Sequence, residues 1–311
     1  MSPLINARHY SVNQSVQADL EYAPDKNYLF ALDYLTCIQV TGDKASEFLQ
    51  GQLSCDMRAI SETAMRHAVM CDLKGRVLAA LDVLLRPNTG YLLVSPEDLA
   101  ASIRATLSKP AMFSRTQLHS STLQVYGFYL QNENDRIPFE SPLPTETNQM
   151  LCSEQYSCYQ ITPSFFVWVV DSAVAHEMIA PFRLAQQYRG AFAWHALQLQ
   201  ARRFEIYPET QGLFLPHRLD MHNTGYLNFE KGCYKGQEII ARMHYRATLK
   251  HALVSTVLET QRPLRSGMAL LGDDHETVIG EVIDYTPQDN HHYLVVASIV
   301  KDYTGAIHVQ V

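Results

Sequence analysis

The sequence predicts an α+β protein that has more than one domain and ends in an all-β unit. Its length of 311 residues indicates about two domains, with one to three all compatible. Strand-like and helix-like segments alternate up to about residue 250. Beyond that point, short β-rich pieces separated by Gly, Asp, Asn and His predict a small barrel or sandwich.

The first part of the chain predicts an arm followed by one α+β unit. Residues 1–27 are polar and aperiodic, which predicts a loosely held arm. The segment 28–40 is rich in β-forming residues and predicts a strand or a strand pair. Asp43 is a suitable N-cap for a short helix that carries Phe48 and Leu49 on one side. The unit continues with strands at 68–72, 77–85 and 91–94, and with a helix from Ser95-Pro96 to about Lys109-Pro110.

A second α+β unit is predicted from about residue 120. Its elements are a strand at 122–130, a proline-containing surface loop at 132–149, a strand at 165–170 and a helix at 172–188. Helical spacing returns at Phe192, and the chain becomes irregular after Arg203. The C-terminal β-rich pieces are 253–258, 277–283, 293–300 and 307–311.

Composition and charge exclude several classes of protein. With 47% hydrophobic and 18% charged residues, the chain as a whole is not disordered. The net charge of −7 argues against a general nucleic-acid-binding surface. The start has no apolar run typical of a secretory signal, and no stretch of about 18 apolar residues is present. The six cysteines lack zinc-site spacing, so we expect a cytoplasmic protein with free thiols and no membrane segment.

One short segment, residues 231–238, points to thiol chemistry. It reads K-G-C-Y-K-G-Q-E, which predicts a glycine-containing turn just before a helix. The ammonium groups of Lys231 and Lys235 and the following helix N-terminus favour a thiolate, so Cys233 is the candidate reactive thiol and Lys231 its activator. Cys37 and Cys71, in apolar strands, are expected to react slowly. The alternative is a buried, structural Cys233 in a turn that the glycines merely allow.

This segment resembles the signature of the YgfZ family, whose members are folate-binding, tRNA-modification and iron–sulfur-related proteins. That family is related to the glycine-cleavage aminomethyltransferase, the T-protein. The resemblance runs from about residue 28 to 251, and Trp194 lies 39 residues before Cys233, as expected for the family's folate-stacking tryptophan. Other matching pieces, in the same order, are Gly42 to Asp56, Asp72-Leu73-Lys74-Gly75-Arg76, Phe214-Leu215-Pro216 and Ala241-Arg242.

The resemblance implies a specific architecture. The expected fold is α+β, a three-domain aminomethyltransferase-like ring around a central channel, with two α+β domains and a C-terminal β-barrel. The first domain is discontinuous and comprises residues 1–115 plus 196–250. The second domain is 116–195, and the barrel is 251–311.

The resemblance also implies a function and its residues. It implies a folate-binding protein that acts in iron–sulfur protein maintenance and tRNA modification, with tetrahydrofolate or another reduced folate in the channel. Iron–sulfur enzymes that modify tRNA are the expected partners, and direct tRNA binding is left open. Trp194 is expected to stack on the folate with one ring face open, Tyr34 to supply a weaker second stacking surface, and Arg242 to meet the glutamate tail. Cys233 and Lys231 are the expected catalytic residues.

The sequence departs from the T-protein at the acidic pair that supports one-carbon transfer. Ala79 and Ala80 stand at those positions. Asp82 lies on the same strand face as Ala80 but is displaced by about 6.6 Å. A folate-dependent aminomethyltransferase of the glycine-cleavage type is therefore the less favoured alternative, and a non-catalytic adaptor that binds folate is a third. The stretch Arg202-Arg203-Phe204-Glu205 replaces a glycine-containing one and is expected to reshape the channel rim.

Two further sequence patterns bear on possible binding sites. The 13 histidines, among them His195, His217 and His222, show no H-E-x-x-H spacing, so we predict no metal site. The cysteine spacing fits no iron–sulfur cluster within one chain, although a cluster that bridges two Cys233 thiols, or one shared with a partner, stays an alternative. Residues 231–251 hold five basic residues and one acidic one, which fits either a solvated helix face or a site for an anion.

Overall fold

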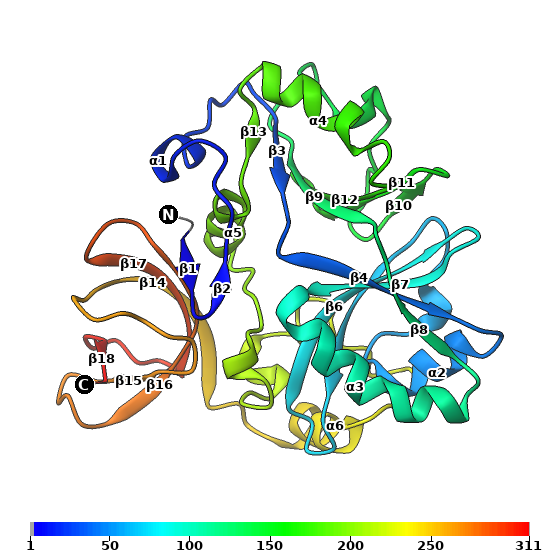
Figure 1. The fold of residues 1–311 in the computed structure, drawn as a ribbon. Coiled ribbons are helices and arrows are strands. Elements are labelled where there is room, and N and C mark those ends of the chain that lie inside the picture. Colours follow the sequence, from blue (N-terminus) through cyan, green and yellow to red (C-terminus); the bar gives the residue numbers. More distant parts are fainter. Residues whose placement is uncertain (1–2, 311) are drawn as a thin grey trace.

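The computed structural model describes residues 3–310, which form three units, each built on its own β-sheet (Figure 1). The first sheet is antiparallel, with the strand order β5-β6-β7-β4-β8. Its strands are β4 (Leu35–Thr41), β5 (Arg66–Cys71), β6 (Val77–Arg86), β7 (Gly90–Pro96) and β8 (Gln117–Ser120). Helices α2 (Ala45–Gln52) and α3 (Glu97–Phe113) and the 3-10 turn η1 (Met57–Ala59) belong to the same unit, and buried residues of both helices enter its hydrophobic core.

The second sheet has six strands in the order β10-β11-β12-β9-β3-β13. They are β3 (Tyr28–Ala31), β9 (Gln124–Tyr129), β10 (Met150–Cys152), β11 (Tyr156–Thr162), β12 (Phe165–Val170) and β13 (Tyr188–Arg189). Strand β12 is buried throughout because both of its faces are covered. Phe166, Trp168 and Val170 pack with helix α4 (Ala175–Leu184), and the alternate residues pack toward the centre of the molecule. The 3-10 turn η2 (Pro138–Glu140) lies in the long loop before β10.

The third sheet is C-terminal and antiparallel, with the order β14-β17-β16-β15-β18. Its strands are β14 (His251–Glu259), β15 (Ala269–Leu271), β16 (Val278–Pro287), β17 (His292–Val300) and β18 (His308–Val309). The β-rich C-terminal unit is thus confirmed. Within residues 3–310 no pairing joins β14 to β18, so the five-stranded ladder is open and does not close into a complete barrel.

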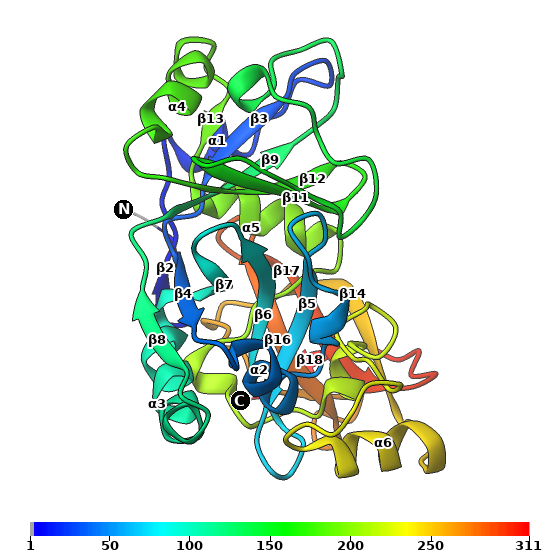
Figure 2. The same ribbon diagram turned by 90° about the vertical axis from the view of Figure 1, so that its right-hand side faces the viewer.

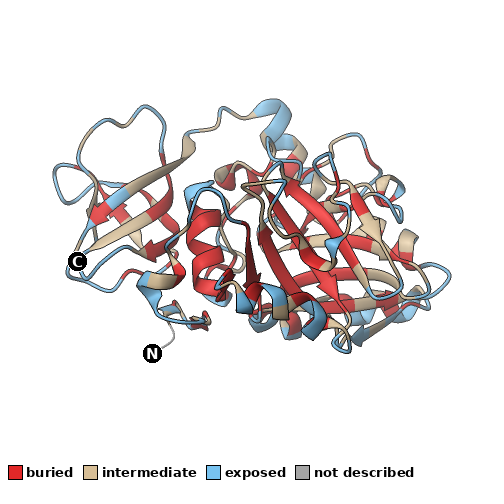
Figure 3. Cartoon of the chain, turned by 90° about the horizontal axis from the view of Figure 1, so that it is seen from above, coloured by how far each residue is buried: buried red, intermediate tan, exposed pale blue. Residues whose placement is uncertain are grey.

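Helix α5 (Ala191–Gln200) lies between the three units and has no solvent-facing side. Every residue from Ala191 to Leu199 is buried, and the helix contacts β3 of the second sheet and β16 and β17 of the third. Figure 3 shows this buried helix between the C-terminal sheet and the rest of the molecule. The segment after it, with 3-10 turns η3 (Pro208–Thr210) and η4 (Pro216–Leu219) and helix α6 (Gln237–Arg246), returns to the first unit (Figure 2).

Three boundaries differ from those predicted. Strand β3 pairs with β9 and β13 and so belongs to the second sheet, although residues 1–115 were assigned to the first domain. Strand β8 pairs with β4 of the first sheet, although its residues were assigned to the second domain. Helix α5 runs without a break through the predicted boundary at residues 195 and 196. Hydrogen bonds between distant strands decide membership, and local sequence does not reveal them.

The prediction of a loosely held arm at residues 1–27 is wrong for the residues from 3 onward. Strands β1 (Leu4–Ile5) and β2 (Arg8–His9) form a hairpin, followed by the short helix α1 (Val16–Asp19). Ile5 and Tyr10 are fully buried, and Arg8 is nearly so. The Arg8 guanidinium donates to the carboxylate of Asp98 and to the carbonyl of Ile206, so polar contacts hold the arm against two distant segments. Among residues 3–310, no helix is both long and apolar enough to cross a membrane.

Candidate functional site

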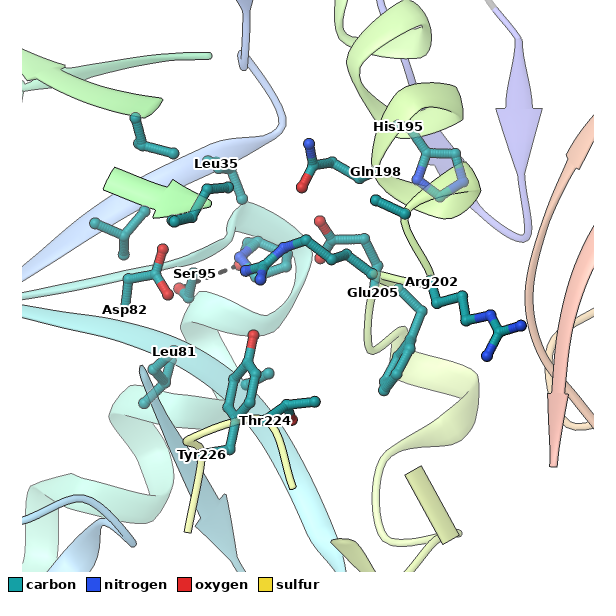
Figure 4. Close-up of a pocket in the computed structure, with 18 of the residues that line it drawn as sticks. Leu35, Leu81, Asp82, Ser95, His195, Gln198, Arg202, Glu205, Thr224 and Tyr226 are labelled. Carbon is teal, nitrogen blue, oxygen red and sulfur yellow. Dashed lines mark hydrogen bonds between the residues drawn. The ribbon is translucent and has the colours of Figure 1, made fainter. Parts of the chain in front are cut away.

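A cavity of about 360 Å³ lies where the three units meet. Its size is within the range of small-molecule binding sites. Its walls come from every unit: Leu35 and Pro96 from the first, Ile161 and Val167 from the second, and Leu253 from the third. Figure 4 shows the polar side chains that reach this space from otherwise apolar surroundings.

Trp194 belongs to the wall of this cavity but does not offer an open ring face. Its exposure is only 4%. A Cβ built on Gly127 would lie 2.5 Å from the indole, so the backbone of β9 touches the ring directly. Phe30 and Phe165 lie next to the ring, with centroids at 5.4 and 5.6 Å. The predicted open stacking platform is therefore corrected, because the core encloses the indole.

Tyr34 also lies in the cavity wall, in the region where a second aromatic was expected. Its hydroxyl donates a 2.8 Å hydrogen bond to Oε1 of Glu205, and its ring lies 4.9 Å from that of Tyr10. Burial, followed by the charge of Glu205, raises the pKa of Tyr34 well above its ordinary value. Tyr34 is thus a neutral, fixed wall residue.

Strand β6 carries one acidic residue in a long apolar run, and that residue faces the cavity. Buried and half-buried residues alternate along the first part of β6, so Ala80 and Asp82 share one face and both line the cavity, while Ala79 is fully buried. Asp82 stands opposite His67 in the β5–β6 ladder, with Oδ1 2.6 Å from His67 Nδ1. Oδ2 accepts the hydroxyl of Tyr159 at 2.7 Å.

The surroundings of Asp82 favour its ionised form. Burial raises the pKa of Asp82, but the charge and hydrogen bond of His67, the Tyr159 hydroxyl and the charge of Arg203 together hold it below its ordinary value. Burial, then the charge of Asp82, raises the pKa of Tyr159 well above its ordinary value. At neutral pH the pair is a carboxylate held by a neutral phenol.

A second polar network borders the cavity where the N-terminal hairpin meets the third sheet. The fully buried Asp284 accepts the hydroxyl of Tyr207 at 2.8 Å and the backbone N–H of Glu205 at 2.9 Å. Tyr207 also hydrogen bonds to Tyr10. Burial raises the pKa of Glu205 and of Asp284, even though Arg8 and His195 respectively act to lower them. These groups connect the arm, the segment after α5 and strand β16.

Gln198 is a buried amide that lacks a partner for its nitrogen. It lies on α5, lines the cavity and is 8% exposed. Its Nε2 makes no hydrogen bond within the described part of the chain. Figure 4 shows the amide directed from the helix into the cavity. Buried amide donors are normally paired, so this one is available to a ligand.

The K-G-C-Y-K-G-Q-E segment lies outside the cavity, against the first unit. The Nζ of the buried Lys231 donates to three carbonyls, those of Gln50, Leu53 and Cys55, at 2.6–2.7 Å. Burial lowers the pKa of Lys231 to about 8. The predicted role of Lys231 as activator of Cys233 is corrected, because its three N–H bonds are directed to the end of α2.

Cys233 is exposed, which contradicts the alternative of a buried structural thiol. It precedes a turn at Gly236 that only glycine fits: φ is 84°, and a Cβ there would lie 2.5 Å from the carbonyl oxygen of Asp72. The backbone N–H of Lys235 donates to the carbonyl of Gly51. Three motifs far apart in the sequence, at 42–56, 72–76 and 231–238, thus meet at one surface.

Arg242 does not lie at the cavity. It is on α6, where it is exposed and pairs with Glu238 at 3.1 Å. The predicted contact of Arg242 with a folate tail is therefore corrected. The cations at the cavity are Arg202, which is exposed, and Arg203, which is half-buried. The unusual Arg-Arg stretch does shape the cavity wall.

Three histidines gather beside α6. The ring centroids of His217 and His222 are 5.0 Å apart, and His244 lies 6.2 Å from His217 and stacks on Phe229 at 3.8 Å. Burial, then His222 and His244, lowers the pKa of His217 to about 4. Within residues 3–310, no three His, Cys, Asp or Glu side chains are arranged to hold a metal ion.

Sequence reasoning named Asp82 but not the groups that hold it, and it missed Gln198. One signal was available for Asp82: a single charge within the apolar run V-L-A-A-L-D-V-L-L. No comparable signal marks Tyr159, which is 77 positions away and in another sheet.

Comparisons with known proteins agree with the motifs. The chain is 27% identical over 259 residues to the tRNA-modifying protein YgfZ of Escherichia fergusonii, covering 81% of this chain and 77% of that protein. The YgfZ protein of an Escherichia coli O7:K1 strain matches equally. The glycine cleavage system aminomethyltransferase T of Bartonella henselae has the same fold, with a TM-score of 0.67, 14% identity, and coverage of 92% of this chain and 82% of that one. No protein-family model matches. The resemblance is thereby confirmed: the chain is a homologue of the YgfZ proteins and has the fold of aminomethyltransferase T.

Proposed function

We propose that this protein binds a reduced folate, such as tetrahydrofolate, in the central cavity and acts in iron–sulfur protein maintenance and tRNA modification. Two comparisons support the proposal. The similar proteins of Escherichia are named tRNA-modifying, and the fold is that of a glycine-cleavage aminomethyltransferase. Its partners would be iron–sulfur enzymes that modify tRNA. The six free thiols suit the cytoplasm as its location.

The observation that carries the folate proposal is the unpartnered amide of Gln198, which enters a cavity lined by both apolar and charged side chains. A buried donor without a partner costs about 1–3 kcal/mol, so a ligand that accepts this hydrogen bond gains affinity there. The pyrimidinone ring of a reduced pterin is planar and carries hydrogen-bond donors and acceptors along one edge. The aliphatic walls formed by Leu35, Ile161 and Val167 suit its faces.

A titration with 5-formyltetrahydrofolate, a stable reduced folate, tests this proposal. Gln198→Leu should weaken binding roughly tenfold, because the apolar side chain cannot donate. Gln200→Leu is the matched control, since Gln200 is the exposed last residue of the same helix and should leave the affinity within about twofold. Absence of binding by the unmodified protein would refute the folate proposal.

The proposal assigns the functional thiol to Cys233. Its exposure is the supporting observation, whereas burial raises the pKa of both Cys37 and Cys71 to about 12. Alkylation at graded pH, read by mass spectrometry, should modify Cys233 first. In cells that depend on this protein, Cys233→Ala should lower the modified-nucleoside content of tRNA. Cys152→Ala, at a half-buried thiol elsewhere, should not. Equal effects of the two variants would exclude a special role for Cys233.

The alternative, aminomethyl transfer from a lipoyl carrier to tetrahydrofolate, is less favoured. Ala80 faces the cavity at a position where the resemblance implies an acid, and loss of a positioned acid–base group usually costs 10²–10⁴-fold. We therefore expect no turnover in a glycine-cleavage assay. Robust turnover would show that aminomethyl transfer, and not folate binding in iron–sulfur protein maintenance, is the better description of the function.

A further inference from the structure

We propose that Asp82 contacts the ligand in the central cavity and sets its orientation, with the N–H-bearing end of the heteroaromatic ring at Asp82 and the acidic tail toward Arg202. This inference rests on the proposed function, because it specifies how the same cavity would receive a reduced folate. It assigns His67 and Tyr159 as positioning residues.

Two neighbours hold the Asp82 carboxylate in a fixed geometry. Asp82 lies on the half-buried face of β6 and lines the cavity. His67 fixes Oδ1 from the neighbouring strand, and Tyr159 fixes Oδ2 from the second sheet. A carboxylate has about four lone-pair sites, so two fixed contacts leave acceptor capacity for N–H donors of a ligand. The side chain is thus held in place while one side of it borders the cavity.

The groups around Asp82 keep its carboxylate charged. The groups that face it are His67 from β5, Tyr159 from β11, Arg203 from the segment after α5, and Tyr226, whose ring stacks on His67 at 5.0 Å. The combined effect lowers the pKa of Asp82, so it is charged at neutral pH. A charged acceptor makes hydrogen bonds that are roughly twice as strong as neutral ones.

Asp82 and Arg202 bring opposite charges to the cavity. In Figure 4, Asp82 and Arg202 lie on opposite sides of the cavity, and Gln198 enters between them. Arg202 is exposed and makes no ion pair within the described residues, whereas the charge of Arg203 acts on Asp82. A ligand tail with carboxylates is repelled by Asp82 and attracted by Arg202. The aminopyrimidinone edge of a pterin, with adjacent N–H donors, fits the opposite end.

Two ligands and two variants test the orientation. The ligands are 5-formyltetrahydrofolate, which has the tail, and 6-methyltetrahydropterin, which has only the ring system. Asp82→Asn should weaken both ligands roughly ten- to hundredfold, since a charge-assisted contact is lost. Arg202→Gln should weaken only the tailed ligand, by about two- to fivefold, because the contact is exposed.

The control is Asp135→Asn. Asp135 is also a hydrogen-bonded carboxylate with a lowered pKa, but it binds Asn27 and Gln187 away from the cavity. It should leave both affinities within about twofold. If the unmodified protein binds the folate and Asp82→Asn binds both ligands as tightly, the orientation is wrong while the proposed function stands. If the unmodified protein binds no folate, the proposed function itself fails.

A second measurement covers the case in which Asp82→Asn does not fold. In His67→Gln the charge that lowers the pKa of Asp82 is lost, so the carboxylate becomes protonated at a higher pH. Folate affinity should then begin to fall at a higher pH than in the unmodified protein. An unchanged pH profile of affinity would overturn the role of Asp82.

Discussion

In the central cavity, polar groups from separated parts of the chain hold one another across sheets: Asp82 contacts both His67 and Tyr159. On the surface that carries Cys233, the chemistry is one exposed thiol on a loop that a buried cation, Lys231, attaches to the first unit. The motif that is easiest to recognise in the sequence, residues 231–238, therefore lies at the surface with Cys233 and not in the cavity. The lysine and glycine of that motif shape the backbone, whereas the cavity also depends on groups such as Tyr159 and Gln198, which no local pattern marks.

The largest expected effect concerns the cavity wall. Trp194→Ala should lower the free energy of unfolding by about 3–5 kcal/mol, because the enclosed indole leaves a hole in the central core. Urea denaturation measures this loss, and Trp194→Phe should lose less. If the Trp194→Ala protein is as stable as the unmodified one but binds folate poorly, Trp194 stacks on the ligand, as the sequence predicts.

The next largest effect is expected for Lys231, which holds the loop that carries Cys233 against the first unit. Lys231→Met should destabilise the protein by roughly 3 kcal/mol, because three carbonyls lose their donor. Lys235→Met, at a half-buried position two residues beyond Cys233, should cost about 0.5 kcal/mol or less. If both variants are equally stable and only Lys231→Met slows alkylation of Cys233, Lys231 is an activator after all.

A smaller effect is expected beside α6. The pKa of His217 is lowered to about 4, below that of an unfolded histidine near 6.5, so the unfolded chain binds more protons between these values. Stability from His217 is therefore complete above about pH 6.5 and declines as the pH falls toward 4. In urea denaturation at several pH values, His217→Phe should reduce this decline by on the order of 1 kcal/mol. His119→Phe, at an exposed histidine outside this cluster, is the matched control.

The smallest effect is expected for Arg242, which lies on α6 and outside the central cavity. Arg242→Ala should change stability by about 0.5 kcal/mol or less, because its pair with Glu238 is exposed on one helix. Folate affinity should stay within about twofold, in contrast to Arg202→Gln. A large loss of folate binding in Arg242→Ala would mean that the ligand site extends to α6.

The sequence predicts most of the longer strands and helices for identifiable reasons, although it does not mark strands β8, β10 and β11. The turns at Gly75 and Gly236 and the apolar strand β12 carry local signals. The buried hairpin carries no such signal. Arginine is usually exposed, and Arg8 can be buried because its guanidinium donates to Asp98 and to the carbonyl of Ile206. Contacts between different sheets join residues that are far apart in the sequence. The residue type at a single position therefore does not reveal its partner.

The hairpin at the start of the chain also sets an order of assembly. Asn6 donates from its backbone to the hydroxyl of Tyr285, a partner 279 positions later, and its side chain bonds to Ser266. At synthesis rates of about 5–20 residues per second, the hairpin waits roughly 15–55 s for Tyr285 to be made. Ile5 and Tyr10 lack their final surroundings throughout that interval. The polar contacts that join the hairpin to the third sheet therefore form only after almost the whole chain has been synthesised.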